Sequence, residues 1–315
     1  LLQTSVLFFF LLAGIGFTVF IAQQDQNLKG KAAEGACTVS TYDAAVLSDT
    51  PLAYWKLGDT DTIVMDCSAL KTHNGIAISS PSATTLPNGD AAKAFDGVAQ
   101  YAQVPDSDDL SVAKTGILTI EAWMRPDILQ FSHQESTGYV HWLGKGESGQ
   151  HEYVARMYSL SNSENRPNRI SGYAFNLAGG LGAGSYFQDP VAVGEWIHYT
   201  LVINTLATSS AYPTGYTKIF KNGVLRDQDS LSDYSIIPSN GTAPLRIGTR
   251  DLSSFFQGAV GKVALYNYEL SPAKLVNHYQ AMYTVAPTIA PTSIPTPGPT
   301  VTPTLVPTAT PIPTA

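Results

Sequence analysis

Aromatic and arginine side chains gather between residues 139 and 187, and together they offer the chemistry of sugar recognition. Aromatic faces stack on sugar rings, while planar polar groups hydrogen-bond to hydroxyls. The residues of this kind, on strands and loops expected to share one sheet face, are Trp142, Tyr153, Arg156, Arg169, Tyr173 and Tyr186. They predict a glycan-binding face. The alternative is that half of them belong to the core, because the pattern does not assign the faces here.

Paired carboxylates of the kind that glycosidases use do not occur on the expected strands. Such enzymes need two carboxyl groups close together, one of them as the acid. Glu121 stands alone between Ile120 and Ala122, so we expect it to be a structural or rim residue. The six histidines form no H-E-x-x-H motif, and the chain has no G-x-S-x-G motif. The sequence therefore predicts a non-catalytic protein, with a carbohydrate-active enzyme as the minor alternative.

Calcium is the one cofactor that the sequence suggests. Its candidate ligands are Asp59, Asp66 and the carbonyl group of Asn74, because a hard cation needs several oxygen ligands. The acidic residues 106–109 do not begin an EF-hand loop, since Ser111 stands where that loop needs a glycine. We expect a solvated turn there.

Charge and cysteine content restrict the partners and the compartment. The net charge of −7, without a cluster of lysine and arginine, argues against a nucleic-acid partner. With 44% hydrophobic and 14% charged residues, the chain can form a large core under a neutral-polar surface, as in extracellular β-proteins. Cys37 and Cys67 indicate a disulfide made in an oxidising compartment, with two free thiols as the alternative. Asn240 begins an N-glycosylation motif in an expected loop.

The elements that position these residues are mostly short strands. Residues 194–227 predict three antiparallel strands, because Asn222-Gly223 between two apolar runs favours a type I′ hairpin turn. Residues 116–126 alternate between apolar and other side chains and predict another strand. Short helices are expected at residues 42–47 and after Ser271, which is followed by Pro272. Many short strands separated by turn signals predict a two-sheet sandwich or a barrel.

The order of these runs resembles the laminin G-like, concanavalin A-like jelly rolls over residues ~40–283. The runs that carry the resemblance include LAYWKLGD, LTIEAWMRP, GEWIHYTLVIN, YTKIFKNGVLRD and FFQGAVGKVALYNYEL. The resemblance implies two curved antiparallel sheets, with Trp55, Trp123 and Trp196 in the core between them. It also implies a calcium ion at the rim, but Gly261-Lys262 stands where the family has an acidic pair, and a lysine there has the wrong charge.

The two ends differ from the middle. Residues 1–22 carry no charge, and residues ~2–34 predict one long helix, apolar first and polar later. This layout resembles the type IV pilins, although Ser5 stands where bacterial pilins usually have glutamate. The resemblance implies that residues 1–34 pack against copies of themselves in a prokaryotic filament. The alternative is an anchor in the lipid bilayer or a truncated signal peptide. Residues 284–315 are rich in proline and threonine and predict an extended stalk.

The sequence thus predicts three parts: residues 1–36 for assembly or membrane insertion, residues 37–283 as a jelly-roll sandwich, and residues 284–315 as a stalk. The predicted function is that of a cell-surface structural or adhesion protein, with a pilin-like filament subunit as the first hypothesis. A single-pass anchored module that binds a surface glycan or matrix is the second.

Overall fold

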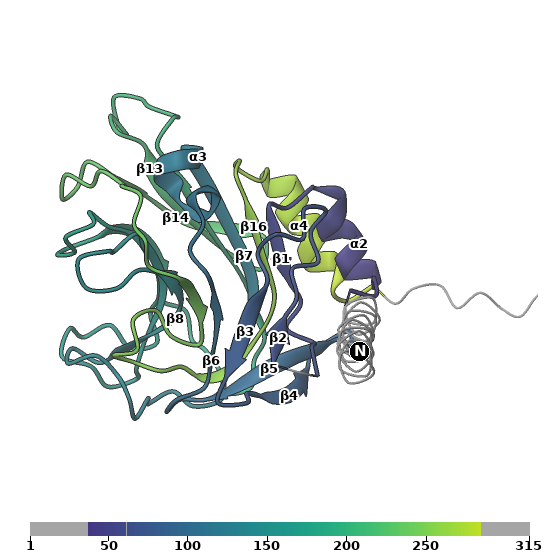
Figure 1. Cartoon of the computed structure of the whole chain (residues 1–315). Coiled ribbons are helices and arrows are strands. Elements are labelled where there is room, and N and C mark those ends of the chain that lie inside the picture. The colour runs from purple at the N-terminus through teal and green to yellow at the C-terminus, as the bar shows by residue number, and fades with distance from the viewer. Residues whose placement is uncertain (1–36, 61, 285–315) are drawn as a thin grey trace, which may run out of the picture. The chain divides into compact units, whose positions relative to one another are not determined.

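The computed structural model describes residues 37–60 and 62–284 (Figure 1). The predicted N-terminal helix and all of the predicted stalk after Thr284 lie outside these residues. The described elements, in chain order, are α2 (Thr41–Ser48), β1 (Ala53–Trp55), β2 (Ile63–Val64), β3 (Gly75–Ile78), β4 (Ser82–Thr85), β5 (Ala91–Asp96), β6 (Tyr101–Val104), the 3-10 turn η1 (Asp108–Leu110), α3 (Val112–Thr115), β7 (Ile117–Pro126), β8 (Tyr139–Lys145), β9 (Tyr153–Tyr158), β10 (Ile170–Ala174), β11 (Ala183–Phe187), β12 (Ile197–Asn204), β13 (Tyr216–Lys221), β14 (Val224–Ser230), β15 (Leu245–Ile247), β16 (Gln257–Tyr266) and α4 (Pro272–Ala281).

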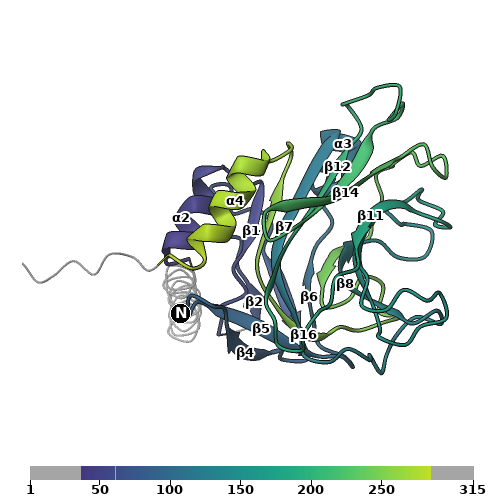
Figure 2. The same cartoon turned by 180° about the vertical axis from the view of Figure 1, so that it is seen from behind.

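Two antiparallel sheets face each other (Figures 1 and 2). In the first, the strands run in the order β14-β13-β12-β7-β16-β5-β4, and β1 also pairs with β16. In the second, the order is β11-β10-β9-β8-β15-β6-β3-β2. The predicted sandwich is therefore confirmed, and we name the two layers the first and the second sheet.

The hairpin of residues 216–230 forms as predicted. Asn222 and Gly223 have positive φ angles of 54° and 77°, which the tight turn between β13 and β14 requires. β12 pairs with β13 on one side and with β7 on the other. These strands lie side by side in the first sheet, where they form the scaffold expected from their alternation.

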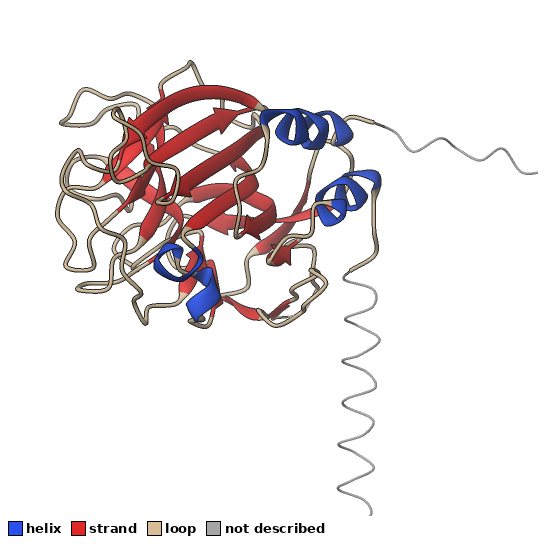
Figure 3. Cartoon of the chain, turned by 90° about the horizontal axis from the view of Figure 1, so that it is seen from above, coloured by secondary structure: helices blue, strands red, loops and turns tan. Residues whose placement is uncertain are grey.

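The two faces of strand β7 point into two different hydrophobic cores. Leu118 and Ile120 are fully buried between the two sheets, as their alternation predicts. Trp123, on the other side of β7, packs in a second core against α2 and α4, which cover the outer face of the first sheet (Figure 3). The prediction that the tryptophans lie between the sheets is right for Trp55 and wrong for Trp123 and for the half-buried Trp196.

Both helices on this face begin where the sequence has a capping residue. Ser40 and Asp43 form a reciprocal capping box at α2: each backbone N–H is bonded to the other side chain, at 3.0 and 3.3 Å. Ser271 caps α4, and Pro272 occupies its first turn. Asp43 is also tied to the first sheet, because it pairs with the buried Lys262 at 2.6 Å. The caps and this ion pair fix α2 against β16.

Glu121 is fully buried beneath the two helices, where four side chains hold its carboxylate. His198 Nε2 lies 2.7 Å from Oε1, and His278 Nδ1 lies 3.0 Å from Oε2. The hydroxyls of Tyr42 and Tyr266 each donate to it at 3.1 Å. Burial alone would raise the pKa of Glu121, but the charge of His278 and the hydrogen bonds from both histidines hold this pKa well below its usual range. The expected structural role of Glu121 fits these contacts.

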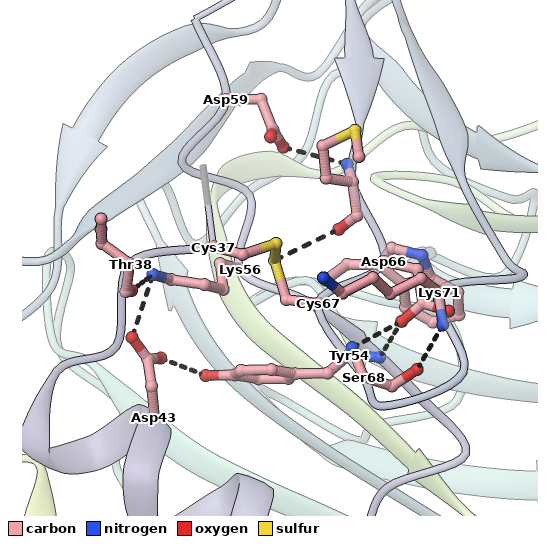
Figure 4. Close-up of a disulfide and its surroundings, with 12 residues drawn as sticks. Cys37, Thr38, Asp43, Tyr54, Lys56, Asp59, Asp66, Cys67, Ser68 and Lys71 are labelled. Atoms are coloured by element: carbon pink, nitrogen blue, oxygen red, sulfur yellow. Dashed lines mark hydrogen bonds and ion pairs between the residues drawn. A yellow bond between two sulfur atoms is a disulfide. The ribbon is translucent and has the colours of Figure 1, made fainter. Parts of the chain in front are cut away.

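Cys37 and Cys67 form the predicted disulfide (Figure 4). Their Cα atoms lie 5.4 Å apart, and the bond spans a sequence separation of 30 residues. Next to it, Asp66 holds the loop after β2. Its carboxylate accepts hydrogen bonds from the backbone N–H groups of Tyr54 at 3.0 Å and Ser68 at 2.9 Å. The disulfide thus ties the segment before α2 to the same loop.

Candidate functional site

The outer face of the second sheet carries four of the six residues predicted to bind a glycan. Side chains alternate between the faces along β9, β10 and β11, so Arg156, Tyr173 and Tyr186 share the solvent side. Arg169, just before β10, joins them at the edge of the same cavity. Four of the six predicted residues therefore form one cluster on neighbouring strands, and glycan binding by them stays a prediction.

Trp142 and Tyr153 do not belong to this cluster, so the prediction that they form part of the same face is wrong. Both are buried in the core between the sheets. The Trp142 ring packs edge-on against Tyr199, with ring centroids 4.8 Å apart. The Tyr153 hydroxyl donates to the backbone oxygen of Leu110 at 3.0 Å. A register shift in β8 next to Trp142 breaks the alternation that would have shown which way its side chain points.

A cavity of about 460 Å³ opens on this face. Three groups of polar residues line it: arginines, tyrosines and carboxylates. They are Arg156, Arg166, Arg169, Tyr139, Tyr158, Tyr173, Tyr186, Tyr234, Glu164, Asp229 and Asp233. The size suits a small number of sugar units, since ligand pockets of roughly 300–1,000 Å³ are common.

The arginines are held by stacking on tyrosine rings. The guanidinium carbon of Arg156 lies 3.9 Å from the ring centroid of Tyr139 and 4.8 Å from that of Tyr173. Arg169 lies 3.7 Å from the ring centroid of Tyr186. Such cation–π contacts fix a guanidinium while leaving its N–H groups free to donate. The Nε atom of Arg156 is buried and has no hydrogen-bond partner among the described residues.

A second group forms the wall beside β9. Arg166 Nη1 donates to the hydroxyl of Tyr158 at 3.1 Å, and the same nitrogen pairs with Glu164 at 2.5 Å. The Tyr158 hydroxyl donates to Glu164 at 3.2 Å. These three side chains are hydrogen-bonded and ion-paired to one another. They therefore form a wall of the cavity in which the positions of the positive and negative charges are fixed.

Carboxylates occupy another part of the lining. Burial raises the pKa of Asp229 to about 6, and the charges of Asp227 and Asp233 act in the same direction. Asp227 accepts a hydrogen bond from the backbone N–H of Tyr186 at 3.0 Å. The cavity thus presents guanidinium donors and carboxylate acceptors together. That combination recognises a ligand rich in hydroxyl groups, each of which both donates and accepts.

The candidate calcium ligands lie elsewhere, around the loop after β2. Asp66 is engaged by backbone N–H groups, and the side chain of Asn74 accepts from the N–H of Asp66 at 2.9 Å. Asp59 Oδ2 accepts from the N–H of Met65 at 3.3 Å. These contacts give the three residues structural roles in the loop, and calcium binding there stays a prediction. Asn240, the candidate glycosylation site, donates its side-chain amide to Asp108 at 2.8 Å.

Sequence reasoning missed several residues of the cavity, above all Tyr158, Arg166 and Asp229. Tyr158 lies two positions after Arg156 on β9, so its place on the same face follows from the strand period. Arg166 comes from the loop after β9, and Asp229 comes from β14. No local sequence pattern indicates that either of them lies beside Arg156.

Comparisons with known proteins agree with this architecture. A laminin G family model, described as the concanavalin A-like lectin/glucanases superfamily, matches residues 96–275, more than half of the chain. No curated protein sequence matches the chain.

Solved structures with a similar fold include receptor-binding domains of botulinum neurotoxins. The domain of the C/D mosaic serotype has a TM-score of 0.54 and 10% identity, over 74% of this chain and 51% of that one. The binding domain of neurotoxin DC, in complex with rat synaptotagmin II, has a TM-score of 0.56 and 11% identity, over 75% and 52%. A structure titled for the interaction of neurotoxin type C with two ganglioside molecules has a TM-score of 0.55 and 11% identity, over 76% and 53%. The chain spans about half the length of these structures, and the similarity at this identity is one of fold.

Proposed function

Because this chain belongs to the concanavalin A-like lectin/glucanases superfamily, we propose that it binds a glycan, without catalysis, in the cavity on the outer face of β8–β11. The observation that carries the proposal is the set of three cavity arginines, each of which lies over a tyrosine ring. Two of the neurotoxin structures that share this fold have titles that name N-acetylneuraminic acid and gangliosides, and this chain spans about half the length of each.

The chemistry of the lining favours an acidic sugar over a neutral one. Several guanidinium groups in one cavity suit a carboxylate or sulfate on the ligand, because charge-assisted hydrogen bonds to arginine are the strong ones. The aromatic residues still exposed at the rim, Tyr186 and Tyr234, offer faces for the sugar ring. Asp229 and Asp233 supply acceptors for the hydroxyl groups.

A glycan array carrying neutral and acidic oligosaccharides tests the proposal, followed by titration with sialyllactose and lactose. We expect the acidic ligand to bind. Arg156→Ala should weaken that binding at least tenfold, which corresponds to a loss of about 1.4 kcal/mol in binding free energy. Arg125→Ala is the matched control, since Arg125 also lies over an aromatic ring, 5.1 Å from the centroid of Trp196, but outside the cavity. An array without bound glycans, or equal loss in both variants, contradicts the proposal.

The non-catalytic part of the proposal has its own measurement. Glu121, the carboxylate on β7, is enclosed by histidines and tyrosines beneath α2 and α4 and does not reach the cavity. We expect incubation with the bound oligosaccharide to release no free sugar, as followed by chromatography. Sugar release that Asp229→Asn abolishes would instead establish the minor alternative, a carbohydrate-active enzyme.

We further propose that the protein acts at the cell surface, as a filament subunit or as an anchored module. The disulfide supports an oxidising, extracellular location. Filament assembly is inferred from the charge-free residues 1–22, which lie outside the described residues. Within the described part, no helix is both long and apolar enough to cross a membrane. Negative-stain microscopy of sheared surface material, with antibody labelling, should show filaments that contain this chain; their absence would leave the anchored module.

A further inference from the structure

Three side chains with metal-binding donor atoms converge beside β8. Glu135 comes from the loop before β8, His141 from β8 itself, and Asp251 from the loop before β16. His141 Nδ1 lies 3.8 Å from Glu135 Oε1 and 3.6 Å from Asp251 Oδ1. One donor atom from each residue lies within 4.8 Å of the other two.

The imidazole of His141 is buried without a hydrogen-bond partner. The residue is only 1% exposed, and neither ring nitrogen has a partner within hydrogen-bonding distance among the described residues. The Oε1 atom of Glu135 is buried and without a partner as well. Buried polar atoms are nearly always hydrogen-bonded, because leaving one unpaired costs roughly 1–3 kcal/mol. A ligand bound between His141 Nδ1 and Glu135 Oε1 would give each of these two atoms a partner.

We propose that Glu135, His141 and Asp251 bind a divalent transition-metal cation of the zinc type. Around a tetrahedral zinc ion with bonds of about 2.0–2.1 Å, neighbouring donor atoms lie roughly 3.4 Å apart. The two separations from His141 Nδ1, 3.6 and 3.8 Å, are close to this spacing, and all three donor atoms lie within 4.8 Å of one another, so side-chain rotation can bring them to one ion. Three protein ligands leave a fourth position for water.

The neighbouring groups keep the three donors available. Arg250 pairs with the other oxygen of Asp251, Oδ2, and so leaves Oδ1 facing His141. The backbone N–H of Ser253 donates to Oδ1 at 3.2 Å and fixes its direction. Ser254 Oγ accepts from the backbone N–H of His141 at 3.1 Å. These contacts hold two of the ligands on a rigid frame, as a metal site requires.

The donor set selects the class of cation. Imidazole nitrogen together with carboxylate oxygen suits zinc and its neighbours among the transition metals, whereas calcium takes six to eight oxygen ligands. The site is separate from the candidate calcium ligands of the loop after β2. None of its three residues lines the cavity, but the two sites are neighbours, because Arg156 of the cavity is the cross-strand partner of His141.

The test uses the full chain after treatment with EDTA and dialysis. We expect titration with zinc chloride to show one ion per chain and to raise the unfolding temperature, while calcium chloride does neither. Glu135→Gln and Asp251→Asn should each weaken zinc binding at least tenfold. His141→Gln should do the same if it folds, which circular dichroism checks.

His133→Gln is the matched control, because His133 is an exposed histidine in the same loop as Glu135 and lies outside the cluster. It should bind zinc like the unchanged chain. The proposal is overturned if the unchanged chain binds no zinc. It is equally overturned if His133→Gln removes the binding while Glu135→Gln and Asp251→Asn retain it.

Discussion

Asp229 is the cavity residue whose ionisation matters most for the folded state. Its pKa is raised to about 6 by burial and by the charges of Asp227 and Asp233, compared with an ordinary value of 3.8. The folded chain therefore binds the proton more tightly than the unfolded chain does. As the pH rises above about 4, stability is lost, and the loss is complete once the pH exceeds about 6.

The substitution Asp229→Asn should remove this loss of stability with rising pH. The variant is expected to be more stable than the unchanged chain at pH 7.5, by no more than about 1 kcal/mol because the residue is partly exposed and water screens its charge. At pH 4 the two proteins should unfold at nearly the same temperature. Calorimetry at both pH values measures the difference; a variant that is less stable at pH 7.5 would contradict the account.

At the residue scale, the sequence predicts which residue types form the site better than it predicts toward which face of the sheet each side chain points. The sequence predicts one face for Arg156 and Tyr173, which they share, and the same face for Trp142 and Tyr153, which instead fill the core. Strands β8 and β9 carry aromatic residues on both sides, so hydrophobicity does not distinguish the two faces there. The register shift after His141 removes the remaining signal, which is the strand period.

Helix α4 is attached to the first sheet through a histidine. His278 Nδ1 lies 3.0 Å from Glu121, and its Nε2 lies 3.1 Å from Asp49, which follows α2. Burial alone would lower the pKa of His278, but the charges and hydrogen bonds of Glu121 and Asp49 outweigh it and raise this pKa above its usual value. The resulting stabilisation is fully present below about pH 6.5 and is lost as the pH rises through the folded-state value.

His278→Gln should therefore lower the free energy of unfolding by roughly 2 kcal/mol at pH 6, because hydrogen bonds to charged groups contribute about 1.5–3 kcal/mol each. The difference should be smaller at pH 9 than at pH 6, because the charge of His278 is lost as the pH rises through its raised pKa. Urea unfolding at both pH values measures it. His133→Gln, at an exposed histidine, should behave like the unchanged chain, and an equal effect of both variants would refute the attachment.

At the element scale, the sequence predicts strands, caps and turns because their signals are local. Asn222-Gly223 and Ser271-Pro272 each specify an element boundary within a few residues. The attachment of α4 was not predicted, since Glu121, His198 and His278 meet only through the strand order β12-β7 and the return of the last helix. Partners so far apart in the chain leave no pattern in a single sequence.

The two outer faces of the sandwich differ in what lies on them. α2 and α4 cover the outer face of the first sheet (Figures 1 and 2), whereas the outer face of the second sheet carries the cavity. The packed core between the sheets separates the Glu121 cluster from the arginines of the cavity. Because distant sites without shared partners contribute additively, we expect Glu121 to affect stability without affecting ligand binding, and Arg156 to affect ligand binding with little effect on stability.

Glu121→Gln tests this separation together with Arg156→Ala. Glu121→Gln should lower the free energy of unfolding by roughly 3–5 kcal/mol, as for one partner removed from a buried ion pair, yet leave the affinity for sialyllactose unchanged while the protein is folded. Arg156→Ala should weaken that binding at least tenfold and change stability little. The double variant should show the sum of both effects within about 0.5 kcal/mol. Binding lost in folded Glu121→Gln protein would mean that the helical face and the cavity are coupled through the sandwich.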